Sequence, residues 1–366
     1  MKHSAEEMLA EALRAWSWES PVVSCERYGM GHINDTFCAV LESGRRYILQ
    51  RINTGIFTDP DGLMENICGV TAYLREKIVA AGGDPERETM NVVPTAVGKP
   101  YYADSDGGAW RVYVFVEGTV CLQNVESAAD FYESAVAFGR FQQLLADYPA
   151  ATLHEAIARF HDTANRYENF EKAVAADAAG RAAAVEREIA FVRARKDDCS
   201  RMMDWLAEGK LPLRVTHNDT KLNNILMDEA TRKGICIIDL DTVMPGLAAN
   251  DYGDSIRFGA NDCDESEKDL SKVNFSLPLF ETFTKGFLET AGGALTAFEK
   301  ETLPWGAKLM TLECGIRFLT DHLEGDHYFK IHYPEQNLDR CHTQFKLVTD
   351  MERDWDTMAA IVRKYA

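Results

Sequence analysis

The sequence has little positive charge for its size. Its 366 residues include 39 Lys and Arg against 58 Asp and Glu, which gives a formal net charge of −19. An acidic excess of this size repels phosphate polyanions and anionic lipids, so we expect no nucleic-acid partner and no membrane-surface role. A small phosphate ligand is still compatible with this charge, because a site can hold local positive charge or a metal inside an acidic protein.

Long apolar runs and paired cysteine motifs are also missing. No window approaches the ~20 apolar residues that a membrane-spanning helix needs. Residues 1–18 lack the basic start and apolar stretch of a secretory signal. The nine cysteines are scattered and none has CxxC spacing, so we expect neither a zinc site nor a disulfide framework. These absences predict a soluble, cytoplasmic protein with reduced thiols, and they leave the oligomeric state open.

The composition is that of a globular protein, with 46% hydrophobic and 27% charged residues. The length exceeds the ~300 residues at which one hydrophobic core usually stops growing, so we expect two lobes. The patterns differ between the two parts of the chain. Residues 20–117 are mostly β-like and carry one main helix, with strands expected at 36–41, 47–52, 100–103 and 110–116 and the helix at 61–81.

Long helical patterns dominate from residue 127 onward. Helices are expected at 128–145, 155–167, 175–208 and from about 271 to the C-terminus, with short β-like runs at 214–216 and 236–238. Glu117–Gly118 is the natural joint between the two parts. The fold class expected is therefore α+β, with a small β-rich N-terminal lobe (1–118) and a larger, mostly helical C-terminal lobe (119–366).

The segment that indicates chemistry is HNDTKLNNILMDEATRKGICIIDLD, residues 217–241. Asn224 follows Asp219 by five residues, and Asp239 ends the second strand after it. This spacing suits phosphoryl transfer, in which one carboxylate accepts the proton of the attacking hydroxyl while a carbonyl oxygen and a second carboxylate hold Mg²⁺. Asp219 has the position of the base, and Asn224 and Asp239 have those of metal ligands. The alternative is that these residues only cap turns between strands.

This block resembles the catalytic core of the aminoglycoside phosphotransferase/choline kinase superfamily. The resemblance implies a two-lobed protein-kinase-like fold with ATP and Mg²⁺ as cofactors. Asn218 stands where protein kinases carry Arg, and Leu240–Asp241 replaces the Phe-Gly of their D-F-G motif, which argues against a protein substrate. Asp241 is either a further metal ligand or a group that supports the ligands.

Upstream residues match the nucleotide site of the same superfamily. YGMGHINDTF, residues 28–37, resembles its nucleotide loop, in which glycines let backbone N–H groups approach phosphate. Arg51 falls where kinases place a strand lysine, with Gln50 as the competitor shifted by one residue and a solvated surface as the other alternative. Glu65 is the expected ion-pair partner of Arg51, with Asn66 as the next candidate. The residues assigned to ATP are Gly29, Gly31, His32, Asn34, Thr36, Arg51, Glu65 and Glu117.

Three further residues surround the catalytic segment. Asp251 resembles the superfamily aspartate that braces the catalytic loop through backbone N–H groups, and we interpret it as structural. His217 is expected to organise the loop by hydrogen bonding rather than to act as a base. Lys221 either neutralises charge on the γ-phosphate, as part of the catalytic set, or points to solvent.

The acceptor is suggested by longer blocks in the C-terminal lobe. Residues 217–228, 238–261, 312–330 and 337–348 together resemble the N-acetylhexosamine 1-kinases. Arg317 and Asp321 share a helix face at i and i+4, so they are either sugar-binding groups or a plain helix ion pair. Arg257 and Arg340 are the other candidates for substrate binding.

The resemblance implies ATP-dependent phosphorylation of the anomeric C1 hydroxyl of GlcNAc or GalNAc. One alternative is a kinase of the same fold that acts on another small alcohol, such as another sugar, homoserine, choline or an aminoglycoside. A less favoured alternative is a kinase-like binding module without turnover, although Asp219, Asn224 and Asp239 are all present.

Overall fold

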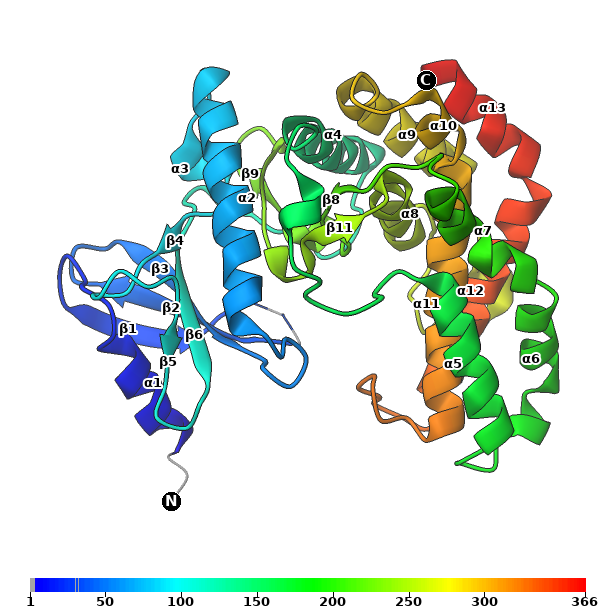
Figure 1. Ribbon diagram of the computed structural model, residues 1–366, viewed down its shortest axis with the longest axis horizontal. Coiled ribbons are helices and arrows are strands. Elements are labelled where there is room, and N and C mark those ends of the chain that lie inside the picture. Colours follow the sequence, from blue (N-terminus) through cyan, green and yellow to red (C-terminus); the bar gives the residue numbers. More distant parts are fainter. Residues whose placement is uncertain (1–3, 30, 32) are drawn as a thin grey trace.

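The computed structural model describes residues 4–29, 31 and 33–366, and it consists of two lobes with helix α2 standing between them (Figure 1). The smaller lobe is built on an antiparallel sheet in the order β1-β2-β3-β6-β4, with β5 also pairing with β6. Its strands are β1 (Val22–Arg27), β2 (Asp35–Leu41), β3 (Arg46–Ile52), β4 (Val92–Val93), β5 (Tyr102–Ala103) and β6 (Ala109–Val114). Its helices are α1 (Ala5–Leu13), α2 (Pro60–Ala80) and α3 (Pro85–Glu88).

Helices cover both faces of this sheet. Trp16, which follows α1, packs with Leu49 and Trp110 on one face. Ile67 of α2 packs with Tyr113 on the other face. Because neighbouring residues of a strand point to opposite faces, the position of a side chain in β3 or β6 decides which helix it meets.

The larger lobe is mostly helical and carries two small antiparallel sheets, β10-β9-β7 and β11-β8. Its strands are β7 (Thr119–Val120), β8 (Arg214–Thr216), β9 (Ile225–Asp228), β10 (Gly234–Ile237) and β11 (Met244–Gly246). Its α-helices are α4 (Ala128–Leu144), α5 (Thr163–Ala176), α6 (Glu186–Arg193), α7 (Lys196–Ala207), α8 (Ala248–Gly259), α9 (Leu277–Ala291), α10 (Ala297–Glu301), α11 (Leu303–Glu324), α12 (Gln336–Arg353) and α13 (Trp355–Tyr365). Short 3-10 turns are η1 (Ala150–Thr152), η2 (Ala182–Ala184), η3 (Leu222–Asn224), η4 (Leu240–Thr242) and η5 (Leu270–Lys272).

The core of the larger lobe lies around α8, α9 and α11. Tyr252 of α8 has its ring edge-on to Phe283 and Phe287 of α9, and its hydroxyl is hydrogen-bonded to Thr284. Almost every residue of α8 is buried. This helix therefore provides a rigid platform under the loop that follows β8.

The two-lobed α+β prediction is confirmed, and most predicted elements lie where the patterns put them. The single helix predicted at 175–208 is wrong, because the chain turns after α5 and continues as η2, α6 and α7. The helix predicted at 155–167 is also wrong, since α5 begins only at Thr163. The N-terminal lobe carries α1 and α3 in addition to the main helix that was expected.

The chain passes from one lobe to the other at Gly118, which has a φ of +64°. β6, which ends at Val114, belongs to the sheet of the smaller lobe, whereas β7 pairs with β9 of the larger lobe. We therefore propose 1–118 and 119–366 as the two lobes. Within the residues that the structure describes, no helix is long and apolar enough to cross a membrane.

Candidate active site

The loop after β8 carries Asp219 and is fixed from below by α8. Asp251 of α8 accepts hydrogen bonds from the backbone N–H groups of His217 (2.9 Å) and Asn218 (2.8 Å). Asn218 has a φ of +63°, a conformation that costs free energy in a non-glycine residue. Its side chain donates to the carbonyl of Thr242, 2.8 Å away, which holds it there. The predicted bracing role of Asp251 is confirmed.

His217 organises the loop through both ring nitrogens. Its Nδ1 lies 3.3 Å from the backbone nitrogen of Asp219, which donates to it, and its Nε2 lies 2.9 Å from the carbonyl of Ile238. Nδ1 accepts and Nε2 donates, so these two partners fix the orientation of the ring. His217 is buried and connects the catalytic loop to the end of β10, as predicted.

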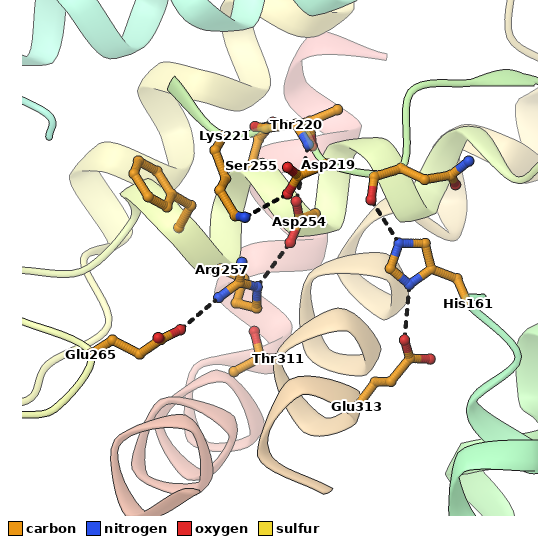
Figure 2. Close-up of polar contacts among 12 residues, drawn as sticks. His161, Asp219, Thr220, Lys221, Asp254, Ser255, Arg257, Glu265, Thr311 and Glu313 are labelled. Carbon is orange, nitrogen blue, oxygen red and sulfur yellow. Dashed lines mark hydrogen bonds and ion pairs between the residues drawn. The ribbon is translucent and has the colours of Figure 1, made fainter. Parts of the chain in front are cut away.

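Asp219 is set between a cation and an amide. Its Oδ1 is 2.7 Å from Nζ of Lys221 (Figure 2). Its Oδ2 accepts a hydrogen bond of 3.0 Å from Nδ2 of Asn224. Burial alone would raise the pKa of Asp219, but His217, Asn224 and above all the ion pair with Lys221 together outweigh this and lower it. The same contact raises the pKa of Lys221 to about 12. Asp219 is therefore an ionised carboxylate at neutral pH, the form that accepts a proton or a hydrogen bond from a hydroxyl.

Asp239 lies after β10 in a left-handed conformation, with a φ of +59°. Desolvation by the surrounding protein, together with the charges of Asp241 and Asp219, raises the pKa of Asp239 to about 7. Its side chain nevertheless remains accessible to solvent, so a ligand can reach it. Crowded carboxylates of this kind favour a bound cation.

A metal held here would depend on more than the acidic side chains. Among the described residues, no group of three or more His, Cys, Asp and Glu side chains is placed to hold a metal ion. Asn224 and Asp239 would supply two oxygen ligands, since Nδ2 of Asn224 is already used by Asp219. Mg²⁺ commonly takes one or two such protein ligands and completes its coordination with substrate phosphates and water, so the residues present fit this metal.

Asp241 is held from the other lobe. Its Oδ2 accepts a hydrogen bond of 2.6 Å from Nδ2 of Asn34, which lies between β1 and β2. Its Oδ1 is 2.5 Å from Nη1 of Arg111, a fully buried residue of β6. Sequence reasoning missed Arg111, although an arginine inside the apolar run of a central strand is a recognisable signal, since buried arginines are rare unless they are paired.

The predicted ion pair between Arg51 and Glu65 is wrong. In the β3–β6 register Gln50 lies opposite Arg111, and Arg51 lies opposite Trp110. Arg51 therefore points to the face of the sheet that α1 covers, where its Nε lies 3.9 Å from Asp104 and its guanidinium lies over the Trp110 ring. Glu65 instead contacts the imidazole of His154, 2.7 Å away. Arg51 is thus on the wrong face to contact phosphate at the loop carrying Asp219, and its assignment to ATP is corrected.

The other residues assigned to the nucleotide lie around the β1–β2 loop and the hinge. Gly29 has a φ of +77°, which glycine adopts at low cost. The Thr36 hydroxyl accepts a hydrogen bond from Gln50, and Glu117 pairs with Arg46 at the hinge. Gly31 has open space where a Cβ would stand. His32 lies outside the described residues.

Two of the predicted substrate residues are already paired with protein groups. Arg257 is buried, and its Nε donates to Asp254 (2.8 Å), which in turn accepts from the backbone N–H of Thr220 (3.0 Å) (Figure 2). Arg340 donates to the carbonyl of Lys330 and to Asn337. Both arginines therefore support loops, Arg257 directly below the catalytic one.

Asp321 also differs from its prediction. It does not pair with Arg317, because its two oxygens accept hydrogen bonds from the backbone N–H groups of residues 327, 328 and 329 and from the Asn337 amide. It fixes the loop after α11. Arg317 instead lies over the rings of Phe160, Tyr328 and Phe329, at 5.6, 5.6 and 5.3 Å from their centroids.

A histidine that sequence reasoning did not single out connects this aromatic group to the catalytic loop. His161, next to Phe160, has Nδ1 2.8 Å from Glu313 of α11 and Nε2 3.0 Å from the carbonyl of Asn218 (Figure 2). Burial would lower the pKa of His161, but the charge and hydrogen bond of Glu313 outweigh this and raise it. The cluster of Arg317 and its three aromatic rings is therefore linked, through Phe160 and its neighbour His161, to the residue that precedes Asp219.

Several solved structures share this arrangement of lobes. The microcompartment-associated aminopropanol kinase matches with a TM-score of 0.65 and 16% identity over 97% of this chain and 98% of that chain. An amicoumacin kinase in complex with AMP-PNP, Ca²⁺ and amicoumacin matches with a TM-score of 0.58 and 16% identity over 99% and 94% of the two chains. A choline kinase from Cryptosporidium parvum Iowa II matches with a TM-score of 0.56 and 13% identity over 99% of each chain. Identities this low show the fold alone.

The sequence itself gives the family. Residues 24–274, which include the β1–β2 loop, the loop with Asp219, and both Asp239 and Asp251, match the phosphotransferase enzyme family. The match covers more than half of the chain. The chain is therefore an enzyme of the phosphotransferase enzyme family.

Proposed function

We propose that this phosphotransferase is an ATP-dependent kinase that phosphorylates the anomeric C1 hydroxyl of N-acetylhexosamines, GlcNAc or GalNAc. The observation that carries the reaction class is Asp219, an ionised carboxylate whose two oxygens are oriented by Lys221 and Asn224. ATP as the donor, with a divalent metal, is supported by the amicoumacin kinase solved with AMP-PNP and Ca²⁺. The acceptor is proposed from the resemblance of the long C-terminal blocks to the N-acetylhexosamine 1-kinases.

In the proposed mechanism Asp219 orients the acceptor hydroxyl and takes its proton. Lys221 keeps this carboxylate ionised and in place, and its positive charge would also stabilise negative charge on the transferred phosphoryl group. Mg²⁺, bound through Asn224 and Asp239, would neutralise charge on the phosphates. An anomeric hydroxyl is more acidic than an ordinary alcohol, so positioning is expected to contribute more to the rate than proton removal.

The cluster beside the catalytic loop supports a sugar acceptor. Sugars are bound by fixed polar side chains and by aromatic rings that stack on them. Arg317 and the exposed ring of Tyr328 provide these two kinds of group. Arg166 lies near enough to Arg317 that burial and this second positive charge lower the pKa of Arg166. Two neighbouring guanidinium groups would repel a cationic acceptor such as choline or an aminoglycoside, which favours a neutral one.

A panel of hydroxyl acceptors with ATP and Mg²⁺ tests the acceptor. The panel includes GlcNAc, GalNAc, glucose, homoserine, choline and an aminoglycoside, and the product is examined by phosphorus–proton coupled NMR. Coupling of phosphorus to the anomeric proton of an N-acetylhexosamine is the expected result. Coupling only to another proton, or turnover only with an amine-bearing acceptor, contradicts the 1-kinase proposal.

Asp219→Asn tests the base. The substitution keeps the side chain's shape but removes the proton acceptor, so kcat is expected to fall by at least about a hundredfold. ATP affinity measured by calorimetry should stay close to that of the wild type. Asp356→Asn, at an exposed position of α13, is the matched control and should leave kcat unchanged. Near-native turnover of Asp219→Asn would remove Asp219 from this role.

A further inference from the structure

Arg111, Asp241 and Asn34 form a polar bridge between the two lobes that sequence comparison with kinases does not predict. The strand residue that faces Arg111 is Gln50, whose Oε1 accepts from Nε (3.1 Å) and Nη2 (2.9 Å) of the guanidinium. The remaining guanidinium nitrogen, Nη1, lies 2.5 Å from Oδ1 of Asp241. All three guanidinium nitrogens of Arg111 are therefore directed by identified partners.

Both carboxylate oxygens of Asp241 contact residues of the smaller lobe. Its Oδ1 faces Arg111 and its Oδ2 accepts from Asn34, so each oxygen already has a partner from the smaller lobe. Asn34 is itself oriented, since its Oδ1 accepts the backbone N–H of Asn53 at 2.9 Å. The Asp241 side chain is only 3% exposed. A metal ion would have to displace one of these contacts to bind Asp241.

Burying the ion pair of this bridge costs free energy, which a contact that served stability alone would avoid. Burying an ion pair removes two charges from water, and apolar side chains of similar size are often at least as stabilising. Arg111 is the buried cation that pairs with Asp241, and both side chains are almost fully shielded from solvent.

We propose that Asp241 is a positioning residue and not a metal ligand, and that Arg111 and Asn34 hold it so that the nucleotide loop and Asp239 keep a fixed relative position. Arg111 on β6 thus binds a carboxylate of the other lobe, whereas the cation expected on β3 was assigned to phosphate. The inference rests on the proposed use of ATP. Its consequence is that nucleotide affinity in the presence of metal depends on Asn34 and Asp241 as one unit.

A double-mutant cycle on the full chain tests this unit. ADP binding is measured by calorimetry with Mn²⁺ and again with EDTA, for the wild type, Asn34→Ala, Asp241→Asn and the double variant. Each single substitution is expected to weaken Mn²⁺-dependent ADP binding about tenfold, and the double variant no more than either single one, because coupled residues are not additive. Binding in EDTA should change much less.

A direct count of bound metal separates positioning from ligation. Electron paramagnetic resonance of Mn²⁺ in the ADP complex should give the same number of bound ions for Asp241→Asn as for the wild type. Loss of an ion in Asp241→Asn, or effects that multiply in the double variant, would overturn the proposal. Asn34 lies in a partly exposed loop, so Asn34→Ala leaves the core intact and keeps the test valid even if Asp241→Asn lowers stability.

The neighbouring arginine of β3 provides the matched control. Arg51→Gln removes a positive charge one position from Gln50 but on the opposite face of the sheet, and it should leave ADP binding unchanged with either metal condition. If Arg51→Gln weakens binding as much as Asn34→Ala, the bridge is wrong. A wild type that binds no ADP with Mn²⁺ overturns the proposed use of ATP itself, whereas normal binding with multiplying effects overturns the bridge alone.

Discussion

At the scale of single residues, the catalytic loop depends on groups that never touch the reacting atoms. His161 is one of them, because it connects the carbonyl of Asn218 to Glu313 of α11. The His161 and Glu313 side chains are 11% and 2% exposed. A protonated imidazole satisfies both partners, whereas a neutral one has a single N–H and cannot donate to both.

The pH dependence of stability follows from this pair. The pKa of His161 is raised from 6.5, so its contribution is fully present below pH 6.5 and is lost as pH rises through the raised value. Burial opposes ionisation of Glu313, but His161, Arg166 and Thr163 together outweigh it and lower the pKa of Glu313 from 4.5, so that contribution is lost only as pH falls below this value. The pair is therefore expected to stabilise the fold most between pH 4.5 and 6.5.

Thermal melting across pH checks this prediction. His161→Gln should lower stability by about 3 kcal/mol near pH 6, because Glu313 is left buried without its cation. The difference in Tm between wild type and variant should shrink as the pH rises from 6.5 to 9. Glu313→Gln should flatten the wild-type pH dependence in the same way. A constant Tm difference over this range would mean that the pair is not ionised.

The incorrect assignment of Arg51 and the missed contact between Asn34 and Asp241 have physical explanations at this scale. In YILQRI the polar residues Gln50 and Arg51 are adjacent, and a shift of one residue turns a strand side chain to the other face of its sheet. The alternation of polar and apolar residues does not show whether Gln50 or Arg51 points toward the larger lobe. The contact of Asn34 with Asp241 joins residues 207 positions apart, and no local pattern signals it.

At the scale of secondary-structure elements, the platform under the loop is the crossing of α8 and α11. Two glycines let these helices approach closely, since a Cβ on Gly306 would lie 1.9 Å from the carbonyl oxygen of Ala249. A Cβ on Gly253 would likewise lie 2.2 Å from the carbonyl oxygen of Gly306. These are backbone atoms, so the helices themselves would have to move apart.

Gly306→Ala is therefore expected to destabilise the protein by about 3 kcal/mol, the upper part of the range for overpacking a core. Because α8 carries Asp251 and Asp254, kcat should fall as well. Urea unfolding and kinetics of the same preparations measure the two effects. Gly293→Ala is the control, since no heavy atom lies within 4 Å of its Cβ. Equal stability of the two variants would show that the crossing tolerates separation.

Elements with strong periodicity and clear ends were the predictable ones. The helix predicted at 61–81 agrees with α2, which starts after Asp59 as its N-cap with Pro60 in the first turn. The helix predicted at 175–208 was wrong because a local turn at Asp177 competes with the helix, and the high helix propensity of the alanine-rich sequence gave no sign of it. Asp177 adopts a left-handed conformation and accepts hydrogen bonds from the backbone N–H groups of Arg181 and Ala182, which ends α5.

At the scale of the whole molecule, a few polar contacts tie the lobes together. Arg87 and Glu88 of the short helix α3 pair with Asp228 and Arg140 of the larger lobe. The length and the change of periodicity along the chain predicted the two lobes, and their joint at 117–118 stays a prediction. The sequence did not predict these contacts, because each joins exposed or partly exposed charged residues that resemble any solvated surface.

Another buried contact between the lobes involves Asn66 of α2, which is 1% exposed. Its Nδ2 donates to the carbonyls of His154 (2.8 Å) and Val243 (3.0 Å), and its Oδ1 accepts from the backbone N–H of His154 (2.8 Å). Val243 follows Asp241 by two residues, so this side chain sets α2 against the segment that carries the proposed metal site.

Asn66→Ala removes three hydrogen bonds and leaves buried backbone groups without partners, so we expect a loss of about 3 kcal/mol. The adjacent Glu65 is the matched control, because its contact with His154 joins side chains that are 70% and 47% exposed. Glu65→Ala should change stability by no more than about 0.5 kcal/mol. Denaturant unfolding followed by tryptophan fluorescence measures both.

The six tryptophans lie in both lobes, so a transition that splits in two for Asn66→Ala would show that Asn66 makes the lobes unfold together. An unsplit transition with unchanged midpoint would instead assign that coupling to the contacts of α3.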